Sequence, residues 1–320
     1  MEDNKLDARD YSILRELDAN FRQSFSKIGK KVGLSKNSVA LRFEKLKEYI
    51  HHDITCADEE LLGYSMVRIY YSLDFYNDAL EKEIINEVKK HKNIIWAARL
   101  YGDYDLAVCL LVDNLNDLIF QIIKFDERFS SKINQKEILV VYERQYFRNN
   151  FIHKTPIDET CVISKTSKKM SLSDVERKIL SLIGLNSRIS IVEIARKTRL
   201  SPRTVSTKLK LMEKNKIIKG YFMTLNANKF NFDTFKLLIQ VQNPKKTEEF
   251  EKYFASLKNT RYILKMLGSW DYEVDMMYHN ITELQHQIEV MKEKFPSFFK
   301  RIKIISFGKR ITSNKEYAVV

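Results

Sequence analysis

The stretch SKIGKKVGLSKNSVALRFEKLKEYI, residues 26–50, has a counterpart 166 residues later in VEIARKTRLSPRTVSTKLKLMEKNKIIKGY, residues 192–221. Sliding the chain of 320 residues against itself by that offset gives eleven identities in the 34 positions of residues 6–39. A fixed internal period of this kind indicates that the fold consists of repeated structural units. The sequence therefore predicts two copies of one unit, at roughly residues 6–150 and 172–315.

Each unit begins with three short amphipathic helices. In the first copy, apolar residues recur at spacings of three and four, which places each set on one face of a helix. The turn before the third helix contains Gly33 in the first copy and Arg199, a poorer turn residue, in the second. Two helices joined in this way are typical of a helix-turn-helix. The apolar stripes are Ile13, Leu14 and Leu17, then Phe25, Ile28 and Val32, then Val39, Phe43, Leu46 and Ile50.

Capping residues indicate the same helix starts. Ser173 with Glu176, and Ser190 with Glu193, have the spacing of a capping box, in which each side chain satisfies the other residue's amide. Proline suits the first position of a helix, so a Ser-Pro pair before the last of the three helices is a further start signal. The other cap candidates are Asp7, Ser24, Ser35 and, directly before Pro202, Ser201.

The remainder of each unit alternates strand and helix periods. Its order is β-α-β-β-α-β, which is typical of a ferredoxin-like antiparallel sheet with helices on one face. The other face of each sheet is rich in Val, Ile, Tyr and Leu and needs a cover, most simply a second sheet. We therefore expect an α+β fold whose two sheets pack together, within one chain or between chains. Helices are expected near residues 77–90, 115–129, 247–257 and 281–294.

Charge is unevenly distributed along the chain. The net charge is +13, of which residues 171–222 carry +8 and residues 1–54 only +2. A compact basic block suggests a polyanionic partner, although a solvated lysine-rich surface is the alternative. The polar segment FIHKTPIDETCVISKTSKKM lacks clear periodicity and is interpreted as a linker. The expected domains are helix-turn-helix domain 1 (1–54), ferredoxin-like domain 1 (55–150), the linker (151–170), helix-turn-helix domain 2 (171–222) and ferredoxin-like domain 2 (223–320).

Composition and motifs exclude several classes of protein. No apolar run approaches the roughly 20 residues of a membrane-spanning helix, and Cys56, Cys109 and Cys161 are too few for a disulfide framework. We expect a cytoplasmic protein with no membrane partner. The sequence contains no Gly-rich phosphate loop, nucleophile elbow or HExxH motif, so no cofactor is expected. His51 and His52 with Cys56 form no expected metal site, because adjacent side chains of a strand point to opposite sides.

The whole order of elements resembles a known family. A helix-turn-helix, a short β linker and a β-α-β-β-α-β domain with a Gly-x-x-Asp turn resemble the leucine-responsive/AsnC, or feast-or-famine, transcriptional regulators. The resemblance covers nearly the whole chain, twice, and includes YGDYDLAV (101–108) and LGSWDYEV (267–274). It implies binding to double-stranded DNA and a response to a small molecule such as an amino acid. Most members carry one unit and pair as homodimers, so the fused units imply a pseudo-dimer within the chain that assembles into larger homo-oligomers.

The third helix of each unit is the expected DNA-reading element. Such a helix reads base edges through its N-terminal residues, while flanking Lys and Arg bind phosphates. The reading faces differ at every aligned position, so we expect unlike half-sites in the bound DNA. Asn37, Ala40, Leu41 and Glu44 of the first copy align with Arg203, Ser206, Thr207 and Lys210 of the second. The predicted contacts are Lys36, Asn37, Arg42 and Lys45 in the first copy and Arg203, Thr204, Ser206, Thr207, Lys208 and Lys210 in the second.

The Gly-x-x-Asp turns are candidates for an effector site. The resemblance implies such a site near these turns, where subunits meet. A Thr often precedes the Gly in the family, whereas Tyr101 and Leu267 occupy that place here. In the competing interpretation Gly permits positive φ and Asp stabilises the turn, with no ligand involved. The candidate residues are Gly102, Tyr104, Asp105, Gly268, Trp270 and Asp271.

Two other functions are compatible with the same architecture. Siroheme decarboxylases resemble paired units of this kind and carry a basic Arg-Arg-Phe-Gly-like stretch in the β linker, with histidines near the tetrapyrrole. This chain has HHDITC (51–56) and KGYFMT (219–224) at those places, which lack the basic stretch. Fold alone does not fix function. The third possibility is an architectural DNA-binding protein, which the salt dependence of binding and competition with nonspecific DNA would distinguish from a site-specific regulator.

Overall fold

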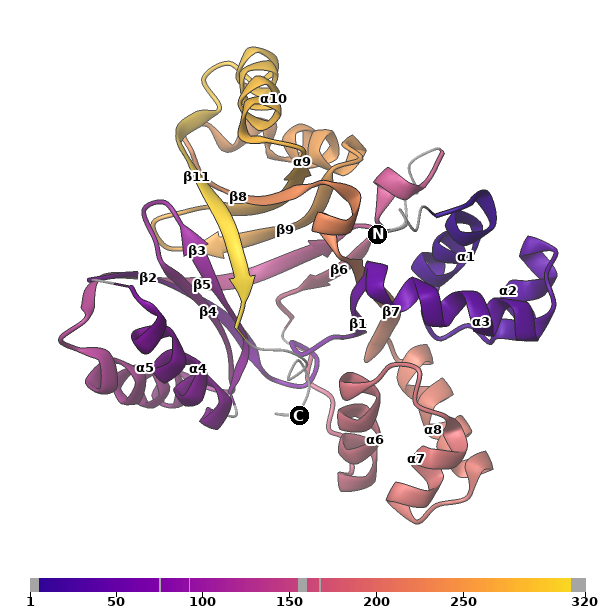
Figure 1. Ribbon diagram of the computed structural model, residues 1–320. Helices are drawn as coiled ribbons and strands as arrows, with labels where there is room; N and C mark the ends of the chain where they lie inside the picture. Colours follow the sequence, from indigo (N-terminus) through magenta and orange to yellow (C-terminus); the bar gives the residue numbers. More distant parts are fainter. Residues whose placement is uncertain (1–5, 75, 92, 155–159, 167, 312–320) are drawn as a thin grey trace.

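The first helix-turn-helix unit has the three helices that the sequence predicts. A computed structural model describes residues 6–74, 76–91, 93–154, 160–166 and 168–311 (Figure 1). Asp7 caps α1 in a full capping box with Asp10, and Ser24 and Ser35 cap α2 and α3 by accepting from backbone amides. We call this unit head 1. Its helices are α1 (Ala8–Ala19), α2 (Phe25–Val32) and α3 (Lys36–Leu46).

Head 2 repeats this arrangement. Ser173 and Glu176 form the predicted capping box, whereas the reciprocal bond predicted for Ser190 and Glu193 is not formed. The Glu193 carboxylate instead lies 3.3 Å from the ammonium of Lys197, one helical turn along. The helices of head 2 are α6 (Asp174–Leu185), α7 (Ile191–Thr198) and α8 (Pro202–Lys214).

The turn between the second and third helix is left-handed in both heads. Gly33 has φ 69°, a conformation that glycine adopts readily, and Arg199 has φ 57° at the equivalent place. Arg199 therefore carries a steric penalty that Gly33 avoids, which explains why the sequence signal for this turn is weaker in head 2.

A two-stranded ribbon joins the heads. β1 (Ile50–Ala57) pairs antiparallel with β7 (Ile218–Leu225), and the two heads share a single hydrophobic core (Figure 1). The contacts across the ribbon are reciprocal. Arg22 donates to the carbonyl of Ser187, and Arg188 donates to the carbonyl of Phe21. Because these pairs exchange partners across the same offset of 166 residues, the heads are related by a pseudo-twofold axis.

The ferredoxin-like domains form two four-stranded sheets that pack against each other. Side chains from both sheets, including Tyr70, Leu139, Leu238 and Leu264, form the core between them, which confirms the predicted sheet-to-sheet packing and places it within one chain. The first sheet has the order β5 (Ile133–Tyr146), β2 (Ser65–Leu73), β4 (Leu106–Val112), β3 (Ile94–Tyr101). The second has the order β11 (Phe299–Arg310), β8 (Asp233–Val241), β10 (Tyr272–Tyr278), β9 (Thr260–Leu267).

The edges of the two sheets are also hydrogen-bonded to each other. β3 pairs with β11, and β5 pairs with β9, with Val141 opposite Met266. The eight strands therefore close into a barrel that has no free edge among them. Two helices cover each sheet on its outer face (Figure 1). They are α4 (Asp78–Lys90) and α5 (Leu115–Phe129) on the first sheet and α9 (Thr247–Ser256) and α10 (Ile281–Lys294) on the second.

The predicted linker contributes a strand of its own. β6 (Cys161–Ser164) extends the barrel sheet by pairing with the end of β5. The buried sulfur of Cys161 lies 2.9 Å from that of Cys56 on β1, and both thiols are free. Part of residues 151–170 thus packs between the ribbon and the barrel. The short 3-10 helices are Lys47–Tyr49, Asn150–Ile152, Ala227–Phe230 and Pro244–Lys246.

Candidate nucleic-acid interface and central cavity

All six predicted DNA contacts of head 2 lie on helix α8, and three of them are exposed. The side chains of Arg203, Thr207 and Lys210 are exposed, because Val205 and Leu209 on the opposite face are buried in the shared core. The predicted contacts Ser206 and Thr204 are half-buried. The Ser201 hydroxyl accepts from the Thr204 amide and lies 2.8 Å from the Thr204 hydroxyl, so the start of the helix is fixed.

The flanking lysine of head 2, Lys208, forms an ion pair within the head. The ammonium of Lys208 lies 3.1 Å from the Glu176 carboxylate on α6, with both side chains about a quarter exposed. This ion pair orients the lysine along the side of α8. Hydrogen bonds from Ser173, and then from Lys208, lower the pKa of Glu176, so the pair is ionised at neutral pH.

Head 1 has a different electrostatic arrangement. The guanidinium of Arg42 lies 2.6 Å from the carboxylates of both Asp7 and Asp10, and Lys45 lies 3.7 Å from Asp10. Asp10 is fully buried, and its hydrogen bond raises the pKa of Arg42. Two of the four predicted contacts in this head therefore stabilise the packing of α1 on α3. Lys36 and Asn37 are exposed at the start of α3, next to the apolar Leu41, which is 76% exposed.

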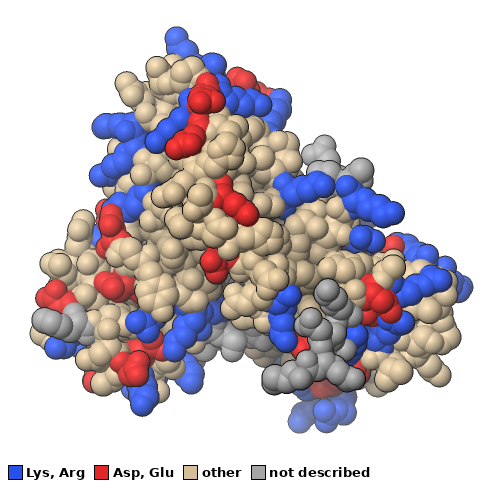
Figure 2. Space-filling model, turned by 45° about the horizontal axis from the view of Figure 1, so that its top comes forward, with Lys and Arg blue, Asp and Glu red and all other residues tan. Residues whose placement is uncertain are grey.

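Basic side chains are spread over the surface and have acidic neighbours. Figure 2 shows blue Lys and Arg groups around the periphery, including the region of the heads, with red Asp and Glu groups between them. Glu44, at the place of Lys210, is exposed and pairs with Lys47 at 2.6 Å. The two reading faces therefore differ in charge as well as in shape.

The Gly-x-x-Asp turns have clear structural roles. The Asp105 carboxylate accepts from the amide of Leu73, and the Asp271 carboxylate accepts in the same way from the amide of Val241. Each aspartate thereby ties its turn to the neighbouring strand. Gly102 and Gly268 have φ values of 124° and 141°, which residues with a Cβ rarely adopt.

The aromatic residues of these turns point into the barrel. Tyr104 and Trp270 are buried between the two sheets, and the indole of Trp270 donates to the Glu137 carboxylate at 2.7 Å. The turns pack these rings into the core and do not line the cavity described next. An effector site at these turns remains a prediction.

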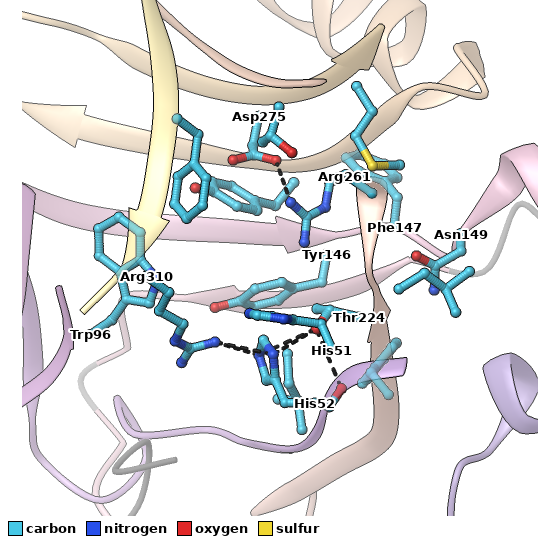
Figure 3. A pocket seen from close by; sticks show the side chains of 18 of the residues that line it. His51, His52, Trp96, Tyr146, Phe147, Asn149, Thr224, Arg261, Asp275 and Arg310 are labelled. Atoms are coloured by element: carbon cyan, nitrogen blue, oxygen red, sulfur yellow. Dashed lines mark hydrogen bonds and ion pairs between the residues drawn. The ribbon is translucent and has the colours of Figure 1, made fainter. Parts of the chain in front are cut away.

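A cavity of about 420 Å³ lies where the ribbon meets the barrel. Its walls come from β1 and β7 on one side and from the barrel strands on the other (Figure 3). A volume of this size is typical of small-molecule sites. Trp96 and Phe307, stacked with centroids 6.3 Å apart, form one apolar wall. Further aromatic lining residues are Tyr146, Phe147, Phe151, Phe222 and Tyr262.

A buried network of charged groups extends from this cavity into the barrel. The Glu273 carboxylate accepts from Arg68 at 3.0 Å and from Lys236 at 2.8 Å, and Tyr70 and Tyr262 donate to it at 2.6 and 2.8 Å. Burial alone would raise the pKa of Glu273, but the charges of Arg68 and Lys236 outweigh burial and lower it to about 2. The carboxylate is therefore ionised across the physiological range of pH.

Asp275 extends the network toward the cavity. Its carboxylate lies 2.9 Å from Lys236 and 3.3 Å from Arg261. Arg261 is the more exposed partner, with 23% of its side chain accessible, and it points toward the cavity in Figure 3. The sequence carried no pattern that singled out these residues, because each lies on a different strand or at a different register.

The two adjacent histidines both line the cavity, contrary to the prediction that they point to opposite sides of a strand. The pairing of β1 with β7 is irregular between Ile50 and His52, and this bulge turns both rings to the same side (Figure 3). The Nε2 atom of His52 accepts from Arg310 at 2.6 Å, and its Nδ1 atom lies 2.8 Å from the Thr224 hydroxyl. Burial, and then the charge of Arg310, lower the pKa of both histidines, so both rings are neutral at neutral pH.

Neither a metal centre nor a membrane anchor emerges from the described part of the chain. Within it, His, Cys, Asp and Glu side chains gather nowhere in a group of three that could hold a metal ion. Over the same residues, the helices lack the combined length and apolar character that crossing a bilayer requires.

Comparisons with known proteins identify a helix-turn-helix domain in each head. Residues 6–47 match the AsnC-type helix-turn-helix domain, and residues 172–219 match a winged helix-turn-helix DNA-binding domain. The HTH-type transcriptional regulator Ptr1 of Methanocaldococcus jannaschii is 33% identical over 113 residues, which are 33% of this chain and 72% of Ptr1. The HTH-type transcriptional regulator LrpB of Bacillus subtilis is 25% identical over 117 residues, which are 37% of this chain and 78% of LrpB.

The fused architecture also has a counterpart among solved structures. The siroheme decarboxylase NirDL superimposes with a TM-score of 0.62 over 97% of this chain and 96% of its own. At 16% sequence identity this likeness concerns the fold alone. The sequence relatives, by contrast, are regulators that this chain covers over more than two thirds of their length. The chain belongs to the leucine-responsive/AsnC family of HTH-type transcriptional regulators.

Proposed function

We propose that the chain regulates transcription by binding one double-stranded DNA site with both heads at once. The observation that carries this proposal is the fixed pairing of two complete helix-turn-helix units by the ribbon and by the reciprocal contacts of Arg22 and Arg188. Paired helix-turn-helix units place their third helices in successive major grooves of the duplex. Here one chain supplies both units, and both third helices expose polar side chains.

The two heads should read different sequences. In head 2 Arg203 can form a bidentate contact with guanine, whereas Asn37 at the same place in head 1 matches adenine better. Identical heads favour a palindrome, and unlike heads do not. The binding site of one chain is therefore a pair of unlike half-sites.

Selection from randomised duplexes, followed by footprinting of the enriched site, tests this function. We expect two unlike half-sites about one helical turn apart, bound more tightly than a random duplex by a factor of about 10³ or more. Recovery of a perfect palindrome read by the two heads of one chain would contradict the unlike half-sites. Equal affinity for every duplex, with a steep salt dependence, would favour an architectural role instead.

The alternative function is that of a siroheme-decarboxylase-like enzyme. The observation that favours it is the fold shared with NirDL over 97% of this chain. The linker stretches HHDITC and KGYFMT argue against it, since both lack the basic motif. We propose that the chain does not decarboxylate tetrapyrroles. In the same set of experiments, mass spectrometry after incubation with siroheme should show the substrate unchanged, and a product lighter by carbon dioxide would favour the enzyme.

We further propose that chains assemble through α5. Leu115, Ile119 and Ile123 lie one turn apart on its outer side, with Phe120 beside them, and the four are each 46–67% exposed. The equivalent face of α10 is largely polar, with His286 at the place of Phe120. An apolar stripe on one of two equivalent helices favours a self-complementary contact between two chains.

Phe120→Glu should convert the oligomer to single chains, because it places a charge within that apolar surface. Sedimentation velocity measures the change. The matched variant His286→Glu on α10 should leave the oligomer intact. A parent protein that sediments as a single chain at micromolar concentration would contradict the proposal.

A further inference from the structure

Positively charged side chains outnumber carboxylates around the central cavity. Three cations, Arg68, Lys236 and Arg261, share the two carboxylates of Glu273 and Asp275. Arg68, Lys236 and both carboxylates are at least 95% buried. Among the described residues that line the cavity, seven are Lys or Arg, of which Lys258 and Lys309 are exposed, and three are Asp or Glu. A surplus of positive charge along a cavity wall favours an anionic ligand.

Polar atoms of Arg68, Thr260 and Asp275 on the cavity wall have no hydrogen-bond partner in the described structure. They are Nη1 of Arg68, the hydroxyl oxygen of Thr260 and Oδ1 of Asp275, and their residues are 5%, 1% and 2% exposed. Buried polar groups normally have partners, so each such atom calls for an explanation. The Asp275 oxygen has the guanidinium of Arg261 as an ionic neighbour at 3.3 Å. The Arg68 and Thr260 groups are donors, and a carboxylate offers the matching acceptors.

The rest of the cavity is apolar and aromatic. The guanidinium of Arg68 lies 4.4 Å from the centroid of Trp96, so the positive group and the aromatic wall adjoin each other. Trp96 stacks on Phe307 with an interplanar angle of 30°. A flat apolar body against these rings would bring its anionic group within reach of Arg68.

We propose that this cavity binds a small aromatic carboxylate. The carboxylate pairs with Arg68 and accepts from Thr260, and the ring lies against Trp96. This site differs from the predicted effector site at the Gly-x-x-Asp turns, whose residues do not line the cavity. The neutral histidines agree with it, because the positive groups that lower the pKa of His51 and His52 also attract an anion.

The position of the cavity couples such a ligand to the heads. His51 and His52 on β1, with Met223 and Thr224 on β7, form the wall on the side of the ribbon, and both heads are attached to that ribbon. The opposite wall belongs to the barrel. A ligand held by Arg68, Thr260 and Trp96 on the barrel wall faces the ribbon across the cavity, so its binding would restrict how the ribbon and the heads move relative to the barrel. This coupling rests on the proposed function in DNA binding.

Titration of the full chain with cinnamate, followed by tryptophan fluorescence and calorimetry, tests the site. We expect saturable binding of cinnamate, with at least about tenfold weaker binding of its neutral analogue cinnamyl alcohol and of inorganic phosphate. L-phenylalanine, whose ammonium group meets the positive cluster, should also bind more weakly. Equal binding of cinnamate and cinnamyl alcohol, or no saturation by cinnamate at millimolar concentration, would overturn the proposal.

Thr260→Val separates the ligand role from a structural one. The substitution keeps the shape and removes a hydroxyl that has no partner in the described structure, so the variant should fold at least as stably as the parent. Cinnamate should bind it about tenfold more weakly. Thr198→Val on α7, remote from the cavity, serves as the matched control and should keep the parent affinity. Parent-like affinity in Thr260→Val would place the carboxylate elsewhere and overturn the assignment.

The coupling is measured separately on the selected DNA site. Saturating cinnamate should change the DNA affinity of the parent, and the change should be smaller in Thr260→Val at the same concentration. Saturable cinnamate binding with no effect on DNA affinity would overturn the coupling, whereas the assignment of the binding site would stand. A chain that binds cinnamate but no DNA would contradict the proposed function, not the site.

Discussion

Replacing Glu273 with glutamine should lower the free energy of unfolding by about 3–5 kcal/mol. The Glu273 carboxylate is fully buried and is shared by Arg68, Lys236, Tyr70 and Tyr262. Glutamine keeps the size of the side chain but leaves two buried cations with one carboxylate fewer. Breaking a buried pair in this way is strongly destabilising, because the remaining charges cannot regain water.

The pH dependence of stability should change with this variant. The pKa of Glu273 in the folded chain, about 2, lies below its ordinary value of 4.5. A lowered pKa contributes stability above the ordinary value, and this contribution is lost as the pH falls from about 4.5 toward 2. Glu273→Gln should remove that part of the acid dependence.

Chemical denaturation of parent and variant, at neutral pH and at several acidic values, measures both effects. Glu248→Gln is the matched control, since Glu248 pairs with Lys252 on the surface with 84% of its side chain exposed. That variant should leave the free energy of unfolding nearly unchanged, because solvent screens an exposed pair. A loss below about 1 kcal/mol in Glu273→Gln would mean that the interior network is solvated and not dry.

Arg203→Ala should weaken binding to the selected DNA site by about 1–3 kcal/mol and relax discrimination at one base pair. Arg203 is exposed near the start of α8, where side chains of a reading helix reach base edges. Lys208→Ala should weaken binding to all sequences alike and reduce the salt slope by about one unit. Both changes lie in head 2, which carries most of the positive charge.

Arg42→Ala in head 1 should affect DNA affinity less. Its guanidinium already pairs with Asp7 and Asp10 at 2.6 Å, so its charge is largely compensated within the head. The variant should instead lower stability, because it leaves the buried Asp10 without its closest partner. Binding isotherms over a salt series, on the selected site and on a random duplex, compare the three variants. Equal damage from Arg42→Ala and Arg203→Ala would contradict the ranking of the heads.

Local periodicity was sufficient to predict most of the elements. The helices expected near 115–129 and 281–294 occur as Leu115–Phe129 and Ile281–Lys294, because apolar spacing marks them. In the structure each begins after an Asn cap. The closure of the barrel was not predicted. The pairing of β5 with β9, and of β3 with β11, joins strands from different units, and such long-range partners leave no periodic signal.

Functional residues were predictable from the sequence only where they lie together on a single helix. The exposed reading faces of α3 and α8 follow directly from the apolar stripes opposite them. The cavity could not be found in this way, because its residues come from strands throughout both units. The histidine pair shows a second reason for the difference. Strict alternation predicts opposite sides, but one bulge in β1 turns both rings into the same space.

The proposed binding mode would give the molecule a polarity on DNA, because the reciprocal contacts of Arg22 and Arg188 pair two heads that are not identical. These contacts hold the two heads as equivalent partners, while the reading faces at Asn37 and Arg203 differ. A symmetric dimer on a palindrome looks the same from either end. In the proposed complex, a single chain with unlike heads would fit its site in one orientation, so α5 would always face the same flank of the DNA. The orientation of the bound DNA site would then decide whether a second chain or the transcription machinery contacts that helix.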